Sequence, residues 1–357
     1  MKSRRAFMSI AAAEGNLGDL FIRRTVTRLV QAKGHEAVLY TGKMGKSYVD
    51  AFELPPNWVA TPSPMRFLKM LAASCFQRRA VIVMAPAPAR LDAKISAVGK
   101  RLGVALLIAL SSALGNHVAV MGRAIRGSGF LALCGEKLIA RCSSLYIARD
   151  KQTVLIAGGR AQFKPDLGFA AISLRIKAES TLRPTRNIVA LSLRYTPDTK
   201  TVRNFVSEMQ SAGFKVVTVT QVQQDRALND EIARVCQIEH IDWPESRSHL
   251  AQESLVVSVY NRSVAVVSDR LHALIIGGRY GAVPVIADRV EEDKLHATLD
   301  SLLMPQSVWL HGGRRPEGAQ SKLDLTVRER ERIASAFASA ATSLEAPLAS
   351  LVEKLDS

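Results

Sequence analysis

The sequence is poor in cysteine and has no long hydrophobic run. Its four cysteines (Cys75, Cys134, Cys142 and Cys236) form no Cys-x-x-Cys pair, and no histidine cluster stands beside them. A zinc site and a disulfide framework are therefore both disfavoured. The longest apolar stretch beyond the N-terminus runs from Val104 to Leu114 and covers 11 residues. It is too short to cross a bilayer, so we expect no transmembrane segment.

Acidic residues are scarce relative to basic ones. The 357 residues include 48 lysines and arginines but only 32 aspartates and glutamates, which gives a net charge of +16. An excess of this size favours an anionic partner such as nucleic acid, acidic lipid or a phosphorylated substrate. Aromatic residues make up only 6% and do not alternate with basic ones. Stacking on bases has little support, so we expect no nucleic-acid partner.

Several nucleotide and hydrolase motifs are missing. No Gly-x-Gly-x-x-Gly follows the first expected strand, and no Gly-Lys-Ser/Thr follows the glycine pairs at 158–159 and 277–278. No Gly-x-Ser-x-Gly is present either. These absences disfavour a nicotinamide cofactor, a P-loop and an α/β-hydrolase. Residues 3–9 resemble a twin-arginine export signal, but the apolar stretch at 6–13 leads directly into a glycine turn. We therefore expect a buried strand there and a cytoplasmic protein.

What is present is a regular alternation of apolar strand patterns and amphipathic helix patterns. In the first half it predicts strands at 6–13, 36–40, 80–85, 104–110 and 144–148, with helices at 20–33, 90–102 and 123–138. In the second half it predicts strands at 187–193, 215–220, 237–242, 263–267 and 283–287. Helices are expected there at 198–212, 225–235, 249–260, 269–280 and 291–302. Such alternation indicates α/β architecture with parallel, doubly wound sheets.

A polar stretch from Lys177 to Arg186 separates the two series and contains Pro184. We place a domain boundary there. The expected domains are 1–180 and 187–315, followed by an amphipathic helical segment at 320–357 with a break at Pro347. This segment either folds back onto the first domain or lies on a partner. Two Rossmann-like domains of this kind predict a GT-B-like arrangement, with the active site in the interdomain cleft at the carboxyl ends of the strands.

The segment that carries the clearest chemistry begins at Ser268. A buried strand is expected to deliver Ser268 and Asp269 to the start of a helix, where either side chain can cap the first amides. Arg270 and His272 then fall in the first turn, where a cation opposes the helix dipole. An anion held by the same amides would reverse that penalty. Arginine suits phosphate or carboxylate, and histidine can bind an anion or transfer a proton.

This segment, residues 268–287, resembles the C-terminal signature of the polysaccharide pyruvyl transferase family, in which a strand ends in Ser-x-Arg-x-His before a helix. Further pieces resemble family elements in the same order along the chain. They are Gly-Asn-Leu-Gly-Asp at 15–19, the strand ending in Arg149-Asp150, the Asp-x-x-Phe stretch at 166–169, and Ser-Leu-Arg at 192–194.

The resemblance implies a transferase that moves the enolpyruvyl group of phosphoenolpyruvate onto a sugar as a pyruvate ketal and releases phosphate. Its acceptor would be a glycan, as in exopolysaccharide biosynthesis, or a lipid-linked oligosaccharide precursor. It implies no cofactor and no metal. A lipid-linked acceptor is compatible with peripheral attachment to an anionic membrane surface at the inner face of the membrane. The sequence leaves homo-oligomerisation open.

The resemblance also implies site residues. Arg194 and Arg270 would clamp the phosphate and the carboxylate, and the Leu271 amide would hydrogen-bond the donor. His272 would either support the phosphate or act as general acid. Asp19 would orient the acceptor or act as base, unless it only caps its helix. The remaining substrate-binding candidates lie on the expected acceptor side: Asn16, Gly18 and Arg149.

Other interpretations stay open at this stage. The segment from Met84 to Arg90 departs from the glycine-rich run of many relatives, and its prolines remove amide donors, so the acceptor is not defined. The enzyme alternative is a GT-B glycosyltransferase that uses a nucleotide-sugar donor. The other alternative is a non-catalytic, basic, membrane-associated protein of the same fold.

Overall fold

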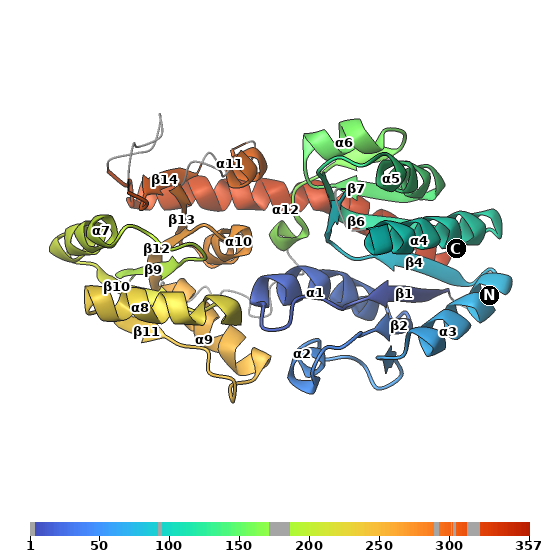
Figure 1. Cartoon of the computed structure of the whole chain (residues 1–357), viewed down its shortest axis with the longest axis horizontal. Helices are drawn as coiled ribbons and strands as arrows, with labels where there is room; N and C mark the ends of the chain where they lie inside the picture. Colours follow the sequence, from blue (N-terminus) through green and yellow to red (C-terminus); the bar gives the residue numbers. More distant parts are fainter. Residues whose placement is uncertain are drawn as a thin grey trace. The chain divides into compact units, whose positions relative to one another are not determined.

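The computed structural model describes residues 4–91, 95–170, 186–288, 293–300, 302, 305–312 and 322–357. Its contacts divide the chain into two compact units. The first unit comprises residues 1–12, 22–173 and 341–357, and the second comprises residues 13–21 and 174–340. The expected boundary at 177–186 lies outside the described residues, apart from Arg186. Each unit has its own sheet and helices (Figure 1).

The sheet of the first unit has eight strands among the described residues, and all of its described pairings are parallel. Its order is β3-β2-β1-β4-β6-β7-β8, with β5 paired to β6. The parallel order arises because each strand is followed by a crossover. The strands are β1 (Arg5–Ser9), β2 (Ala37–Tyr40), β3 (Val59–Thr61), β4 (Ala80–Met84), β5 (Pro88–Arg90), β6 (His117–Arg126), β7 (Leu145–Ala148) and β8 (Ala161–Phe163).

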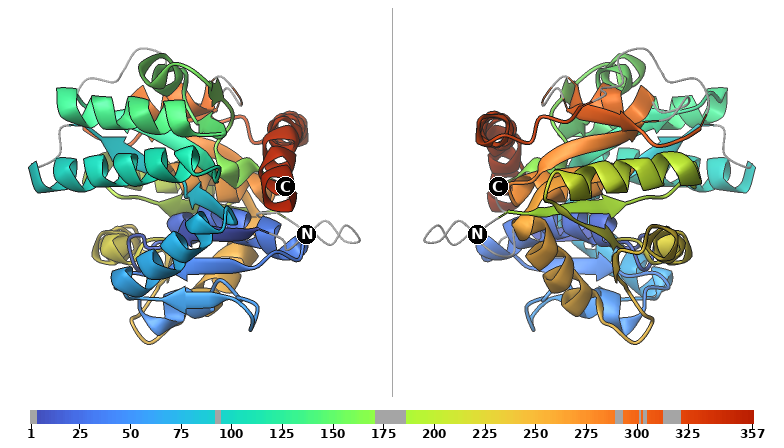
Figure 2. Two further views of the ribbon diagram at one scale, coloured as in Figure 1. Left: turned by 90° about the vertical axis from the view of Figure 1, so that its right-hand side faces the viewer. Right: turned by 90° about the vertical axis from the view of Figure 1, so that its left-hand side faces the viewer.

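Helices cover both faces of this sheet. The bounds are α1 (Leu17–Ala32), α2 (Lys46–Asp50), α3 (Pro64–Phe76), α4 (Ile95–Ala113), α5 (Phe130–Cys142), α6 (Lys151–Ala157) and the short 3-10 helix η1 (Leu167–Phe169). Three of them, α3, α4 and α5, lie side by side (Figure 2, left). Strands such as β4 are apolar throughout because helices shield them on both sides, as expected for a doubly wound unit.

The last helix, α12 (Val327–Asp356), is counted with the first unit from residue 341 onward. Its side chains Leu344, Leu351 and Leu355 are completely buried. The Arg4 amide donates a hydrogen bond to the Leu355 carbonyl at 3.3 Å. The tail of the chain therefore folds back onto the first unit, which is one of the two outcomes that its amphipathic pattern allowed.

The sheet of the second unit has six described strands, again all parallel, in the order β11-β10-β9-β12-β13-β14. On β9, β10, β12 and β13 the side chains of its core are mainly valine. These branched residues suit strands that are buried on both faces. The strands are β9 (Ile188–Ser192), β10 (Lys215–Val219), β11 (Glu239–Ile241), β12 (Ser263–Ser268), β13 (Val283–Asp288) and β14 (Gln306–Trp309).

Two helices of the second unit, α7 and α9, begin at side-chain caps. Asp198 caps α7 by accepting the Thr201 amide at 2.8 Å, and Ser248 caps α9 by accepting the Ala251 amide at 3.2 Å. Such caps satisfy amides that a helix leaves unpaired at its start. The helices are α7 (Thr199–Ser211), η3 (Gln223–Asp225), α8 (Arg226–Cys236), α9 (His249–Arg262), α10 (Leu271–Arg279) and α11 (Asp293–Leu299).

Three local predictions were wrong. Residues 104–110 belong to α4 rather than to a strand, because a short apolar run does not by itself distinguish a strand from a helix. Residues 117–126 form β6, so the expected helix begins only at Phe130 in α5. Helix α12 continues through Pro347, which is itself buried, because Leu344 and Leu348 hold the helix against the unit on both sides of the proline.

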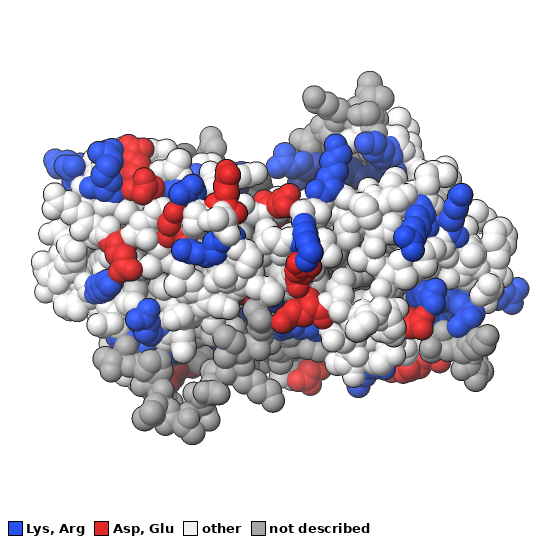
Figure 3. All heavy atoms as spheres, turned by 90° about the horizontal axis from the view of Figure 1, so that it is seen from below, with Lys and Arg blue, Asp and Glu red and all other residues white. Residues whose placement is uncertain are grey.

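The prediction of two doubly wound α/β units with parallel sheets is confirmed. Among the described residues, no helix combines the length and the apolar character needed to span a bilayer. Lysine and arginine side chains are scattered over the face drawn in Figure 3, with aspartate and glutamate between them. On that face the positive excess is not gathered into one patch.

Candidate functional site

The carboxyl ends of β9 and β12 lie next to each other in the second unit. The two strands pair in parallel with Ser268 opposite Ser192, so the loops that follow them leave the sheet at the same edge. The Ser268 hydroxyl donates to the Ser192 carbonyl and accepts the Arg270 amide at 2.9 Å. These bonds fix the turn from β12 into α10.

Asp269 joins the two loops. Its carboxylate accepts hydrogen bonds from the backbone amides of Arg194 at 2.8 Å and Tyr195 at 3.0 Å. The sequence pattern had suggested that Ser268 or Asp269 would cap α10, and this prediction was wrong: α10 has no side-chain cap. The oxygens of Asp269 are used instead to hold the neighbouring loop after β9.

Arg270 stands at the N-cap position of α10, and its side chain pairs with Asp225. The guanidinium donates to the two carboxylate oxygens through Nε at 2.8 Å and through Nη2 at 2.6 Å. Asp225 is buried, and Arg270 is largely shielded from solvent. This two-point geometry is the strong form of an ion pair. It neutralises the charge of Arg270 and uses two of its five N–H donors.

His272 lies against the loop that contains Gly-Asn-Leu-Gly-Asp. A Cβ atom added to Gly18 would stand 2.6 Å from the Cβ of His272 and 2.8 Å from its Nδ1. Only glycine permits this approach of backbone to ring. Residues 13–21 group with the second unit. The loop was expected to bring Asn16, Gly18 and Asp19 from the first domain, and instead it packs among the residues of the second.

The same loop is held by further contacts within the second unit. Gly15, at a φ of +71°, accepts the Gln223 amide through its carbonyl at 2.8 Å. The Asn16 side-chain oxygen accepts the amides of Gly18 at 3.0 Å and Asp19 at 3.2 Å, so Asn16 caps α1. Asp19 is the third residue of that helix, and its carboxylate accepts the Ala13 amide at 3.4 Å.

A buried histidine that the sequence did not single out also anchors this loop. The Gly15 amide donates to His249 Nε2 at 3.3 Å, and the ring packs edge-on against Trp243. Burial lowers the pKa of His249, while nearby Glu14 acts in the opposite direction. An Nε2 atom that accepts a hydrogen bond carries no proton, so the geometry and the lowered pKa both indicate a neutral ring.

Helix α10, like α8 and unlike α7 and α9, begins without a side-chain cap. The first amides of a helix have no partner within the helix, and the dipole gives this end partial positive charge. Leu271 supplies the first of these amides. Amides of this kind can bind an anion.

The other two predicted arginines, Arg194 and Arg149, do not share the surroundings of Arg270. Arg194 is exposed, and its guanidinium carbon lies 4.9 Å from the centre of the Tyr195 ring. Arg149 belongs to the first unit, where it pairs with Asp166 at 3.2 Å. The second unit thus contains Asn16, Gly18, Asp19, Arg194, Arg270, Leu271 and His272. It does not include Arg149.

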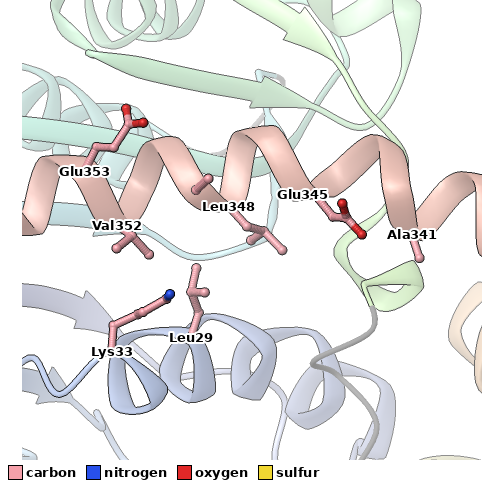
Figure 4. Close-up of a pocket in the computed structure, with 8 residues that line it drawn as sticks. Leu29, Lys33, Ala341, Glu345, Leu348, Val352 and Glu353 are labelled. Atoms are coloured by element: carbon pink, nitrogen blue, oxygen red, sulfur yellow. The ribbon is translucent and has the colours of Figure 1, made fainter.

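A separate groove of about 420 Å³ lies in the first unit between α1 and the second half of α12. In Figure 4, Leu29 and Lys33 rise from α1 toward Val352 and Leu348, while the carboxylate of Glu353 points away from α1. The lining is mainly aliphatic and includes none of the predicted site residues. Among the described residues, no group of three or more histidine, cysteine, aspartate or glutamate side chains is placed to hold a metal ion.

Comparison with known proteins identifies the fold. No protein-family model matches the chain, and no curated protein matches it in sequence. Solved structures of similar fold include a UDP-GlcNAc 2-epimerase from Neisseria meningitidis bound to UDP-GlcNAc. It is 8% identical, with 98% of this chain and 99% of that chain covered and a TM-score of 0.54.

Two further structures agree. A putative UDP-N-acetylglucosamine 2-epimerase from Listeria monocytogenes is 8% identical over 100% of this chain and 90% of that chain, with a TM-score of 0.54. A glycotransferase of kitacinnamycin is 10% identical over 99% of both chains, with a TM-score of 0.50. These likenesses cover the whole chain and establish a GT-B fold. The expected fold class is therefore confirmed.

Proposed function

We propose that the protein is an enzyme that processes a nucleotide-sugar and binds the donor's diphosphate at the start of α10. The observation that carries this proposal is the uncapped helix start itself, set beside Arg270 and His272 at the edge of the second sheet. Helix amides bind phosphate without any side-chain charge. Two solved structures of the same fold support the donor class, since one is a UDP-GlcNAc 2-epimerase bound to UDP-GlcNAc and the other a glycotransferase.

Each candidate side chain has a role in this proposal. Arg194, exposed at the end of β9, would contact the phosphate that the α10 amides do not reach. Arg270, fixed by Asp225, would shape the start of the helix and offer the N–H groups that the ion pair does not use. His272 and Asp19 are the groups able to move a proton, and the Gly18 backbone limits the positions that the His272 ring can take.

Pyruvyl transfer from phosphoenolpyruvate is the second candidate. It is favoured by one observation: the segments that resemble the pyruvyl transferase family at 15–19, 192–194 and 268–272 all group in the second unit. Against it, the donor carries a carboxylate and a phosphate and needs at least two strong cationic anchors. The pairing of Arg270 with Asp225 reduces the positive charge available for that purpose.

Ligand binding separates the two candidates. We expect a nucleoside diphosphate, tested as UDP, ADP, GDP and dTDP by titration calorimetry, to bind and to raise the melting temperature. Phosphoenolpyruvate should do neither. Binding of phosphoenolpyruvate alone, followed by phosphate release with a glycan acceptor, would replace the nucleotide-sugar proposal with pyruvyl transfer. If neither ligand class bound, both would be wrong.

The role of the α10 amides can be tested at Leu271. Proline is tolerated at the first position of a helix, because the amide that it lacks has no partner within the helix. Arg270 already has the extended conformation (φ −108°, ψ 114°) that the residue before a proline favours. The Leu271→Pro variant therefore removes one anion-binding N–H and keeps the helix. We expect nucleotide affinity to fall about tenfold to a hundredfold.

The matched control is Leu271→Ala, which shortens the same side chain and keeps the amide. It should bind the nucleotide within about threefold of the wild type, since no hydrogen bond to the phosphate is lost. Equal losses in the two variants would show that the Leu271 side chain, rather than its amide, matters. Equal retention in both would remove the Leu271 amide from the site.

A further inference from the structure

Helix α3 of the first unit presents apolar side chains to solvent. Met65, Leu68, Ala72 and Phe76 are all exposed, and Phe76 has 77% of its surface accessible. They recur at helical spacing along one side of α3. A surface helix normally places polar residues on its solvent side, so an exposed apolar stripe indicates an interaction surface.

Helix α4 repeats the same feature. Gly103, Leu106, Leu110 and Ala113 are exposed at helical spacing, and Leu106 has 65% of its surface accessible. The buried side of α4 is apolar as well, with Ala105 and Ile108 in the core. Apolar side chains therefore lie on both the buried and the exposed side of α4. In the described part of the chain, neither α4 nor any other helix is long and apolar enough to span a bilayer.

The two helices form one surface. Cys75 of α3 donates a hydrogen bond to the hydroxyl of Ser111 on α4 at 3.5 Å between sulfur and oxygen. Phe67 and Leu107 pack against the same core cluster. Figure 2 shows α3 and α4 side by side in its left view. The exposed stripes thus lie on neighbouring helices of a single unit, and we call them together the α3/α4 face.

The charged side chains of α3 and α4 have one sign, because neither helix contains an aspartate or a glutamate. Two of the nearby cations, Arg101 and Arg123, are paired with Glu136 of α5. Four of the cations on these helices and at the end of α3 are exposed: Arg66, Lys69, Arg78 and Lys100. Aliphatic side chains flanked by cations without carboxylates are complementary to a bilayer with anionic headgroups.

We propose that the α3/α4 face docks the protein on an anionic lipid bilayer, with Phe76, Leu106 and Leu110 entering the headgroup region and the lysines and arginines meeting lipid phosphates. A basic residue near such a surface strengthens binding by about fivefold. The proposal does not depend on the donor site, because α3 and α4 contain none of its residues.

A second copy of the chain suits this face less well. A two-fold interface places the same patch on both subunits, so Lys69 and Lys100 would face other cations rather than carboxylates. Like charges brought together across an interface oppose association. A bilayer with acidic lipids supplies the opposite charge over the whole length of both helices.

The test is co-sedimentation of the full chain with vesicles of phosphatidylcholine, with and without phosphatidylglycerol. We expect binding only to the anionic vesicles, weakened by salt. One variant combines Phe76→Ser with Leu106→Ser, and another combines Lys69→Glu with Lys100→Glu. All four side chains are exposed, so folding should be unaffected. Each variant should bind anionic vesicles more than about tenfold more weakly.

The matched control combines Leu155→Ser with Lys151→Glu on α6, where both side chains are likewise exposed. It should bind vesicles like the wild type. All variants should keep the wild-type melting temperature and nucleotide affinity, so that a failure here is distinct from a failure of the proposed function.

Three results would overturn the proposal: no binding of the wild type to anionic vesicles, undiminished binding of both double variants, or equal loss in the α6 control. Sedimentation velocity supplies a fourth. A concentration-dependent dimer that Phe76→Ser with Leu106→Ser abolishes would assign the α3/α4 face to a second copy of the chain.

Discussion

At the scale of single residues, His249 links the Gly15 loop to the protonation state of one ring. Burial lowers its pKa below the ordinary value of 6.5. The folded state therefore binds this proton less readily than the unfolded state. Its contribution to stability is present above about pH 6.5 and is lost as the pH falls through the lowered folded-state pKa. Protonation would also remove the acceptor for the Gly15 amide.

We therefore expect the free energy of unfolding to decrease as the pH is lowered below about 6.5. Urea unfolding at a series of pH values measures this. The control is His249→Gln, whose amide oxygen can accept from Gly15 without titrating. His117 has a pKa lowered by burial, Arg4 and Lys354, and it is present in both proteins. An identical pH dependence in both proteins would contradict the role given to His249.

The residues of the site were only partly predictable. Arg270 and His272 stand out in the sequence because cations in the first turn of a helix oppose its dipole. Asp225, the partner of Arg270, does not stand out in the sequence. It lies 45 residues earlier, and only the tertiary fold brings the two side chains together. The sequence marks Gly18 as a turn residue. Its close approach to His272 depends on tertiary packing, which a local sequence pattern does not predict.

At the scale of elements, α12 makes the clearest prediction. Leu351 is completely buried in the first unit, so Leu351→Ala should lower the free energy of unfolding by about 2–5 kcal/mol through lost burial and the cavity left behind. Urea unfolding of the purified chain measures the change. Glu345→Ala, at an exposed position of the same helix, should stay within about 0.5 kcal/mol of the wild type. A small effect at Leu351 would mean that this part of α12 does not pack as described.

Elements of the second unit were predicted more closely than those of the first. The strands and helices from β9 to α10 match the periodic pattern within a few residues, because each is short and bounded by turn residues. In the first unit, α4 was divided into a helix and a strand, because its solvent side is as apolar as its core side. The property that misled the sequence analysis there is the same one that marks the α3/α4 face.

At the scale of the whole molecule, the basic residues behind the net charge of +16 lie in several different surroundings. Some of it is neutralised internally, as in the pairs Arg123–Glu136 and Arg270–Asp225. Another part is exposed on α3, at its end and on α4, two helices that contain no acidic residue. The sequence alone predicted an anionic partner, but only the exposed positions separate a proposed donor-binding edge in one unit from a proposed lipid-binding face in the other.

Hydrogen exchange measured by mass spectrometry should show this separation. UDP should slow exchange at residues 13–21, at the end of β12 and in the first turn of α10, because binding stabilises the states that hold the ligand. Anionic vesicles should slow exchange in α3 and α4. If UDP protected α3 and α4 instead, the donor would not be bound at the proposed position.

The division of the chain has a consequence for biosynthesis. The first unit is built from residues 1–12, 22–173 and 341–357, so its sheet emerges from the ribosome long before the segment that covers it. Leu344, Leu351 and Leu355 are fully buried only once this final segment has docked. Domains usually fold in the order in which they are synthesised. Here the second unit can be completed while the first still waits for its last helical turns, so the unit translated first is the last to be finished.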